Sequence, residues 1–392
     1  EACLVGSEMC IRDRDMAVDH ILAELKALAA RPLAEATAPP KGLYHAPEIL
    51  AREQEKVFAK GWLCAGREDE IPAPGDYITY ELGPQPVILV RGKDGAVRAH
   101  ANTCRHRMMR LVEGHGNTSR FTCPYHAWTY GIDGRLAAAP HMERTNCFDR
   151  DKLGLASVRC EIYQGWIYLT LDSDAPPVAV QLASLTPVIE RYGQEHYRTI
   201  FTEEHVWDTN WKCLTENFME SYHLPVAHRE TVGANFTVAE NEFGEVGEDE
   251  DFAFQYFTKT EGAPVGRAHP ANDRLEGVWR HTSVMPSVFP SHMYVLAPDH
   301  LWYLSLQPDG VGRTRIRYGA ALAPEVIDSA DDSHALIAEK KAFLDKVQVE
   351  DRHVVEGIFR GAGSPLATSG PLSWMEQENH QFARYLARRL CD

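Results

Sequence analysis

Residues 104–126 of the chain read CRHRMMRLVEGHGNTSRFTCPYH. The stretch opens with Cys104 and His106 and closes, after sixteen intervening residues, with Cys123 and His126. Two thiolates can hold one iron, and two imidazoles can hold another. Because imidazole is neutral where thiolate is anionic, the imidazole-bound iron is easier to reduce, and such clusters have potentials of about −150 to +300 mV. The pattern predicts an iron–sulfur cluster that passes single electrons.

A zinc site or a chance grouping is the alternative interpretation of these residues. Zinc fingers usually place two to four residues between their paired cysteines and carry their histidines as a separate pair. Here each arm has one Cys and one His, and the first arm is a tight Cys-x-His. We therefore favour the iron cluster. Pro124 and Gly131 fit tight turns that would bring both loops over it.

Short runs of β-forming residues surround these pairs from Gly75 to Asp172. Two of the connections, Lys93-Asp-Gly95 and Ile132-Asp-Gly134, are hairpin signals. The region is expected to form a small antiparallel β domain.

Trp128 and Tyr130 follow the second pair, and with them the segment resembles the Rieske domain of ring-hydroxylating and related oxygenases. Many members of that family have Gly where this chain has Ala127, a change that we expect to be tolerated. The resemblance implies a [2Fe–2S] cluster held by Cys104, His106, Cys123 and His126.

A second candidate metal motif contains His223 and His228. Residues five apart on a straight helix diverge by about 140° and could not share a metal ion. Pro225 lies between them and disfavours helical geometry at Leu224. We therefore expect a helix that ends near His223 and a bend that returns His228 to its side.

Asp351 is the candidate third ligand, because it falls on an apolar face of a predicted helix over residues 333–360. An unpaired buried charge there would cost several kcal/mol, and a metal cation would offset that cost. Glu350 faces Lys346 and His353 along the helix and is expected to be solvated. The apolar neighbours of Asp351 are Leu344, Val347, Val354, Val355 and Ile358.

Two histidines and one carboxylate form the facial triad of non-haem Fe(II) oxygenases. The segment from Glu220 to His228 resembles the iron-binding motif of the same oxygenase family. In that family the cluster of one subunit feeds the iron of its neighbour in a homotrimer, through an acidic residue just before the first histidine. The resemblance implies that role for Glu220. A Glu at this position, rather than an Asp, makes the chain similar to the carnitine, choline and glycine-betaine oxygenases.

The expected fold class is α+β, with an antiparallel β Rieske domain and a catalytic domain of antiparallel sheet flanked by helices, the helix-grip or START-like arrangement of the family. Residues 1–15 are set aside as an artefact or a disordered tail, because Leu4–Asp13 resembles a translated sequencing-adapter read. The expected divisions are an N-terminal helical segment packing on the catalytic domain (16–44), the Rieske domain (45–172) and the iron domain (173–392).

Composition excludes several classes of function. The net charge is −16, which argues against a nucleic-acid partner, because such binding depends on surplus Lys and Arg. No run of 18 apolar residues is present, so no membrane span is expected. Two of the nine cysteines, Cys3 and Cys10, fall in the segment that is set aside, and the other seven show no disulfide spacing. With no export signal expected, this favours a cytoplasmic location.

Taken together, the two motifs predict the oxygenase component of a Rieske non-haem iron mono- or dioxygenase. It would use O2 and electrons from a separate flavin/iron–sulfur reductase that consumes NAD(P)H, since the chain has no nucleotide fingerprint. Aromatic faces attract quaternary ammonium groups, so the expected reaction is hydroxylation or oxidative demethylation of a betaine-like compound. Candidate aromatic contacts are Trp279, Tyr294, Trp302 and Tyr303.

Several alternatives remain open at this point. The four aromatic residues could be ordinary sheet packing. The substrate could be an aromatic carboxylate. The chain could also be a Rieske electron carrier or a non-catalytic oligomeric scaffold, although a carrier leaves the two-histidine motif and about 200 further residues unexplained.

Overall fold

The computed structural model describes residues 18–238, 241–259 and 266–391. The segment 1–15, expected to be an artefact or a tail, lies outside these residues. The chain divides into two compact units. The small unit is Phe58–Val180, and the large unit combines the residues before Phe58 with those after Val180. The expected Rieske domain began at residue 45, whereas residues 45–57 group with the large unit.

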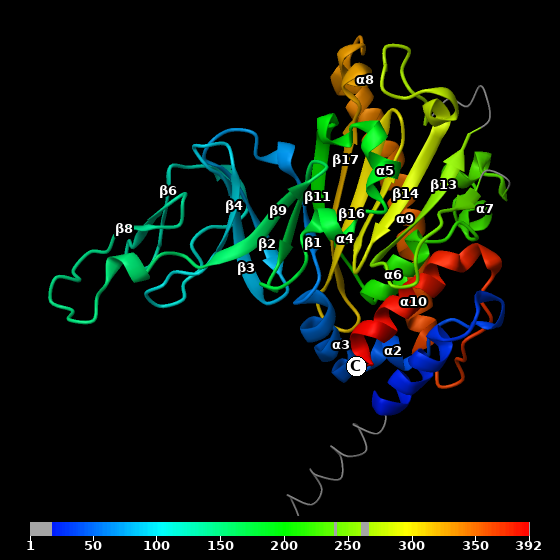
Figure 1. Cartoon of the computed structure of the whole chain (residues 1–392), viewed down its shortest axis with the longest axis horizontal. Helices are drawn as coiled ribbons and strands as arrows, with labels where there is room; N and C mark the ends of the chain where they lie inside the picture. The colour runs from blue at the N-terminus through cyan, green and yellow to red at the C-terminus, as the bar shows by residue number, and fades with distance from the viewer. Residues whose placement is uncertain (1–17, 239–240, 260–265, 392) are drawn as a thin grey trace, which may run out of the picture. The chain divides into compact units, whose positions relative to one another are not determined.

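The small unit is built from two antiparallel sheets (Figure 1). The larger has the strand order β1-β10-β9-β4-β3-β2-β5, and the smaller has the order β6-β7-β8. Both predicted hairpins are confirmed, because β3 pairs with β4 and β7 with β8. The strands are β1 Leu63–Arg67, β2 Asp76–Leu82, β3 Gln85–Arg91, β4 Val97–Ala101, β5 His115–Asn117, β6 Arg120–Thr122, β7 Thr129–Gly131, β8 Leu136–Ala138, β9 Ser157–Tyr163 and β10 Trp166–Thr170.

The large unit is organised by one antiparallel sheet with the order β11-β17-β16-β15-β14-β13-β12. Its strands are coloured from green to gold in Figure 1. Sequential hairpins join β12 through β17, and β11 pairs with β17 at the far edge. The strands are β11 Arg198–Trp207, β12 Asn241–Phe243, β13 Phe252–Thr258, β14 Thr282–Val288, β15 His292–Leu296, β16 His300–Pro308 and β17 Thr314–Leu322.

Helices of the large unit pack on this sheet: α6 against β16, α9 against β11 and α10 against β13. The longest is α9 (Ser333–Ala362), which starts where the Asp332 carboxylate accepts hydrogen bonds from the amides of His334 and Ala335. The others are α2 Gly42–His45, α3 Pro47–Glu53, α4 Val178–Gln181 at the division between the units, α5 Thr186–Ile189, α6 Trp211–Phe218, α7 Leu224–Ala227, α8 Pro324–Asp328 and α10 Gln377–Leu390. Residues 18–29 are also helical.

These elements confirm the α+β class and the long helix predicted over residues 333–360. Within the described ranges, no helix is both long and apolar enough to cross a bilayer. The N-terminal segment belongs to the large unit through contacts with α10 and the residue after it: Arg384 donates to the carbonyl of Ala29, and the Cys391 thiol donates to the carbonyl of Leu22.

A buried ion pair explains why residues 45–57 group with the large unit. Lys212 Nζ on α6 lies 2.6 Å from Glu53 Oε1 on α3, and both side chains are fully buried. The Trp211 indole donates to the second oxygen of Glu53 at 2.8 Å. This pairing fixes α3 to the helix that precedes His223.

Replacing Lys212 with Met should destabilise the large unit by about 3–5 kcal/mol, because it leaves the Glu53 carboxylate buried without its counter-charge. Urea unfolding of the variant measures this loss. The double variant Glu53→Gln/Lys212→Met should recover part of it, because no charge is then buried. A single variant as stable as the parent would contradict the role given to the pair.

Candidate metal centres

Three side chains of the large unit converge as ligands to one metal ion would. One nitrogen or oxygen from each of His223, His228 and Asp351 lies within 4.8 Å of the other two. Asp351 Oδ1 is 3.0 Å from Nε2 of His228 and 3.7 Å from Nε2 of His223. Two imidazole nitrogens and a carboxylate oxygen therefore face a common point.

The two histidines meet because each lies at an end of the short helix α7. His223 is the residue before this helix and His228 the residue after it, with Pro225 in the first turn. The sequence predicted a helix ending near His223, but α6 ends at Phe218 and α7 runs between the two histidines. His228 has left helical geometry (φ −108°, ψ 27°), so the divergence expected of a straight helix does not apply.

Burial explains what a cation would contribute here. His228 and Asp351 are 1% and 7% exposed, and Asp351 lies on the buried face of α9 with Leu344, Val347 and Val355 as predicted. Two other predicted members of that face differ: Val354 is only partly buried and Ile358 is exposed. The Asn217 side chain donates one hydrogen bond to Asp351 Oδ1 at 2.8 Å. When neither imidazole directs a proton at the carboxylate, this amide alone leaves most of its desolvation cost unmet. The donor set fits a divalent iron held by two histidines and one carboxylate.

Each histidine has a carboxylate on its other ring nitrogen. Nδ1 of His223 is 2.6 Å from Glu220 Oε1, and Nδ1 of His228 is 2.7 Å from Glu350 Oε2. A carboxylate at Nδ1 holds the proton there and leaves Nε2 free to bind a metal. Burial lowers the pKa of His228, but the carboxylates of Asp351 and Glu350 outweigh it, so the pKa is raised. Glu350, expected to be solvated, instead contacts the site.

In the small unit, two loops of the same backbone form carry the other four predicted ligands. The amide of Cys104 donates to the carbonyl of Met109, and the amide of Cys123 donates to that of Trp128, five residues on in each case. The fourth residue after each cysteine, Met108 or Ala127, has a φ near +57° (58° and 56°). Glycine adopts this conformation most easily, so the Gly expected from the family resemblance would suit the position that Ala127 occupies here.

The side chains of these loops divide by chemistry. Cys104 and Cys123 belong to one buried cluster, and each is 3% exposed. His106 and His126 are exposed, and their ring centroids are 4.7 Å apart. Thiolates on the buried side and imidazoles on the outer side fit a cluster whose irons have different ligand pairs.

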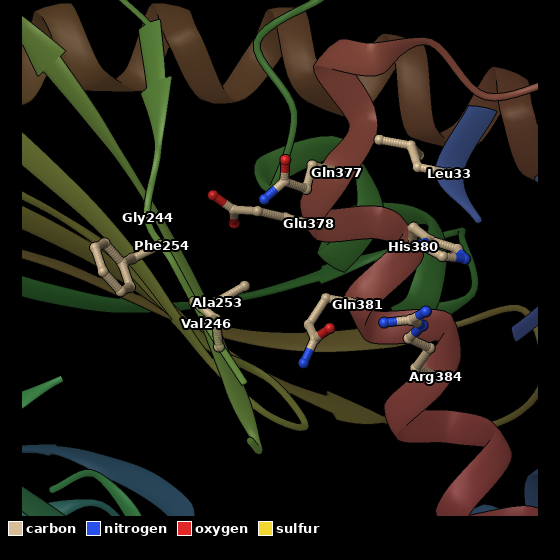
Figure 2. Close-up of a pocket in the computed structure, with 10 residues that line it drawn as sticks. All are labelled: Leu33, Gly244, Val246, Ala253, Phe254, Gln377, Glu378, His380, Gln381 and Arg384. Carbon is tan, nitrogen blue, oxygen red and sulfur yellow. The ribbon is translucent and has the colours of Figure 1, made fainter. Parts of the chain in front are cut away.

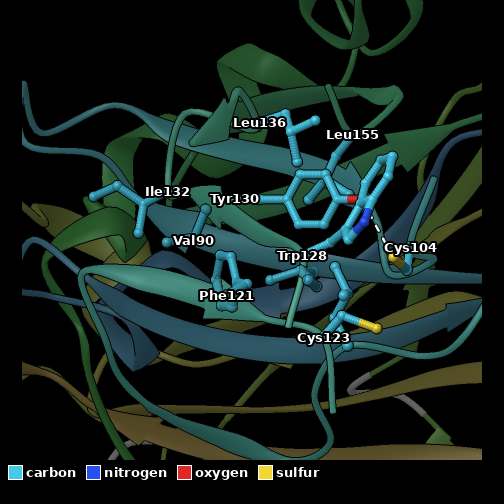
Figure 3. Packing of buried hydrophobic residues seen from close by; sticks show 11 residues of the cluster. Val90, Cys104, Phe121, Cys123, Trp128, Tyr130, Ile132, Leu136 and Leu155 are labelled. Atoms are coloured by element: carbon cyan, nitrogen blue, oxygen red, sulfur yellow. Dashed lines mark hydrogen bonds between the residues drawn. The ribbon is translucent and has the colours of Figure 1, made fainter. Parts of the chain in front are cut away.

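Tyr130 and Trp128 hold these loops in place (Figure 3). The Tyr130 hydroxyl lies 3.3 Å from the Cys104 sulfur and accepts a hydrogen bond from the amide of Arg105 at 3.0 Å. The Trp128 indole stacks on His106, with centroids 4.9 Å apart and planes 8° from parallel. The two aromatic residues noted in the sequence thus contact a cysteine and a histidine directly.

Comparison with known families matches both units. Residues 189–391 match the family described as ring hydroxylating alpha subunit (catalytic domain), and residues 61–149 match the Rieske [2Fe-2S] domain. The chain belongs to the ring-hydroxylating α-subunit family. As a member it carries a Rieske [2Fe–2S] domain and a catalytic non-haem iron site, and the predicted resemblance and cofactors are confirmed.

Several relatives of this family member have described functions. The carnitine monooxygenase oxygenase subunit of Escherichia coli (strain K12) is 37% identical over 199 residues, 50% of this chain and 53% of the relative. The glycine betaine monooxygenase oxygenase subunit of Chromohalobacter salexigens is 35% identical over 196 residues, 50% and 44% of the two chains. Both matches span about half the length of the relative or less. The chloroplastic choline monooxygenase of Spinacia oleracea is 26% identical over 369 residues, 92% and 80% of the chains.

Solved structures share the fold of this family. A quaternary ammonium Rieske monooxygenase in complex with L-carnitine has a TM-score of 0.78 at 24% identity, over 93% of this chain and 98% of that one. A naphthalene 1,2-dioxygenase from Rhodococcus sp. has a TM-score of 0.74 at 22% identity, over 91% and 95%. The same fold therefore occurs in a protein that binds L-carnitine and in a naphthalene dioxygenase.

Of the four predicted substrate contacts, the structure places Trp302 on the sheet face that the helices cover. Its ring lies 5.3 Å from that of Phe218 on α6. Its cross-strand partner Ala320 pairs in turn with Phe201, over whose ring the Lys341 ammonium of α9 lies. Directly paired residues share a sheet face, so Trp302 faces the helices that carry the iron site.

The other three aromatic residues are not brought to that face. Tyr303 follows Trp302 along β16 and pairs with Tyr294, so both lie on the opposite face, and both are buried. Trp279 lies under the Arg191 guanidinium, 3.8 Å from its ring centroid, and meets Tyr256 edge-on. These three residues therefore pack as ordinary sheet residues, which was the alternative interpretation of the four aromatic side chains.

A cavity of about 240 Å³ lies between α10 and β13 (Figure 2). Its walls include the buried acid Glu378, whose Oε2 accepts a long hydrogen bond from Ser287 at 3.3 Å. Burial raises the pKa of Glu378 well above its usual range. None of the predicted ligands or aromatic contacts lines this cavity.

A second unusual acid, Glu216, lies on α6 one residue before Asn217. The Tyr44 hydroxyl donates to both of its oxygens, at 3.0 and 2.8 Å. Burial raises the pKa of Glu216 to about 7, although the hydrogen bond from Tyr44 and the charge of Lys212 oppose the shift. Folding therefore favours the protonated acid between its unfolded pKa of 4.5 and about 7.

Because its folded pKa is the higher one, Glu216 should lower the unfolding free energy as pH rises from about 4.5 to 7, by at most about 3 kcal/mol. Glu216→Gln should remove this slope. Urea unfolding of both proteins across the window measures the difference. Glu339→Gln, at an exposed residue of α9, is the control and should leave the slope unchanged. Parallel curves for the parent and Glu216→Gln would contradict the assignment.

Proposed function

We propose that the chain is the oxygenase component of a Rieske non-haem iron monooxygenase that acts on a quaternary ammonium compound. The convergence of His223, His228 and Asp351, in a chain that also carries a Rieske domain, is the observation that most supports it. An electron carrier would not need a second metal site. A non-catalytic scaffold would not need a carboxylate buried beside two histidines.

The proposed ligand roles follow the geometry of each unit. The mononuclear iron is held by Nε2 of His223, Nε2 of His228 and the carboxylate of Asp351. The cluster is held by Cys104, His106, Cys123 and His126. When bound, the cluster supplies electrons one at a time and the mononuclear iron supplies the activation of O2.

The chain's own residues position these groups. Asn217 donates to Asp351 Oδ1 and so orients the carboxylate. Glu220 accepts from both the Nδ1 and the backbone amide of His223, which fixes the ring. We propose that Glu220 also bridges to the cluster of a neighbouring subunit in a homotrimer, as its place before the first histidine implies. A separate flavin/iron–sulfur reductase and a cytoplasmic location belong to the same proposal.

The substrate class rests on the relatives. Carnitine and glycine betaine monooxygenase subunits are 33–37% identical to half of this chain. Glu220 is also the residue type that the resemblance ties to that branch, and Trp302 supplies an aromatic ring on the helix-covered face. Hydroxylation of an aromatic carboxylate is kept as the second candidate, because a fold shared with naphthalene 1,2-dioxygenase does not by itself select the substrate.

Substrate-dependent O2 uptake tests the proposal. The chain is combined with a generic reductase and NADH, and a panel of carnitine, glycine betaine, choline and aromatic acids is compared. Uptake stimulated by a trimethylammonium compound, with a hydroxylated or demethylated product, is the expected result. Stimulation by aromatic acids alone would favour the second candidate.

Replacing His223 with Ala should abolish product formation and remove the one iron per chain beyond the two of the cluster. The visible absorption of the cluster should persist, because its ligands lie in the other unit. Iron analysis and absorption spectroscopy measure these outcomes side by side. Retained turnover would refute the proposed triad.

Replacing Glu220 with Gln should keep both metals, because an amide oxygen can still accept from Nδ1 of His223. Electron passage to the iron should slow by about 10-fold or more, since the proposed bridge loses its charge. A single-turnover experiment with pre-reduced protein measures the rate. An unchanged rate would refute the bridge while leaving the triad intact.

A further inference from the structure

Glu350 and Asp351 are consecutive residues of α9, yet both contact the imidazole of His228. Asp351 Oδ1 lies 3.0 Å from Nε2, and Glu350 Oε2 lies 2.7 Å from Nδ1. Successive helical residues point about 100° apart. One stretch of helix can therefore reach both nitrogens of a single ring.

The contact of Glu350 is specific rather than incidental. The same oxygen, Oε2, also accepts a hydrogen bond from the hydroxyl of Thr231, three residues after His228. The Glu350 side chain is 23% exposed and that of His228 only 2%. A carboxylate that accepts two hydrogen bonds at the edge of a buried ring is held in one orientation.

Both ring nitrogens of His228 face a carboxylate oxygen, and a metal ion bound at Nε2 would leave Nδ1 as the nitrogen that carries the proton. A carboxylate can only accept, so Nδ1 must donate to Glu350. With a cation between Nε2 and Asp351, the lone pair of Nε2 would point at that cation. The negative charge behind the ring also makes Nε2 a stronger donor to a cation. His223 has the corresponding arrangement with Glu220.

We propose that Glu350 is a positioning residue for the iron site: it fixes the tautomer and aim of His228 and so raises the affinity of the site for a divalent metal. The proposal rests on the proposed role of His228 as an iron ligand. Glu350 itself does not bind the metal. Its loss should weaken metal binding about 10- to 100-fold, the usual effect of removing such a partner.

Titration of the full chain, stripped of its mononuclear metal, with Co²⁺ tests the proposal without turnover. The visible Co²⁺ bands report ligand geometry, and the titration gives the dissociation constant. Glu350→Leu should raise this constant about 10- to 100-fold and shift the bands. Glu350→Gln keeps an acceptor and loses only the charge, so it should rescue most of the affinity, to within about 10-fold of the parent.

Two controls separate the possible failures. Glu339→Leu, at an exposed position of the same helix, should leave the constant and the spectrum unchanged. His228→Ala should weaken Co²⁺ binding severely; if it does not, the proposed ligand role of His228 is what fails. If His228→Ala weakens binding but Glu350→Leu binds within threefold of the parent, the positioning role is overturned.

The conservative variant keeps the test decisive if Glu350→Leu does not fold. Glu350→Gln should then show a weaker constant and displaced bands, because the charge behind Nδ1 is gone. Parental affinity together with a parental spectrum would overturn the proposal. An equal loss of Co²⁺ affinity in Glu339→Leu would overturn it too, because the effect would then belong to the helix rather than to Glu350.

Discussion

The carboxylate of Asp351 is the constraint on which the large unit depends. It lies on the buried face of a 30-residue helix, where an uncompensated charge is among the costliest features a protein can hold. The surrounding elements supply what the charge requires: an amide from α6 and imidazoles from both ends of α7. The fold and the chemistry are therefore not separable here, because the helices pack around the residue that the metal needs.

The small unit positions its four candidate cluster ligands by using the same backbone loop twice. Each loop closes through hydrogen bonds from and to its cysteine, and each turns through a residue with positive φ. The histidine, however, is two residues after the cysteine in one loop and three in the other. The two rings consequently have different neighbours, His106 stacking on Trp128 and His126 lying against Tyr125.

Sequence patterns singled out three residues that the structure brings together, His223, His228 and Asp351, because metal coordination restricts residue type and spacing together. Contacts between different helices and strands were harder to predict from the sequence. Glu350 was expected to be solvated because the helical pattern shows only neighbours on its own helix, and nothing in it reveals that the end of α7 lies alongside. The aromatic residues show a second limit. Trp302 and Tyr303 are adjacent in a strand and must face opposite ways, but the sequence does not say which face the helices cover.

The pairing of Glu350 with Asp351 has a thermodynamic consequence. A metal ligand and the partner of another ligand occupy one rigid helix, so a small rotation of α9 would loosen both at once. Any ion that binds only the docked arrangement stabilises it by mass action. A metal ion bound at the site should therefore also protect the α7–α9 contact against local opening. The rate of hydrogen exchange in that part of the chain then reports what fraction of the sites holds a metal ion.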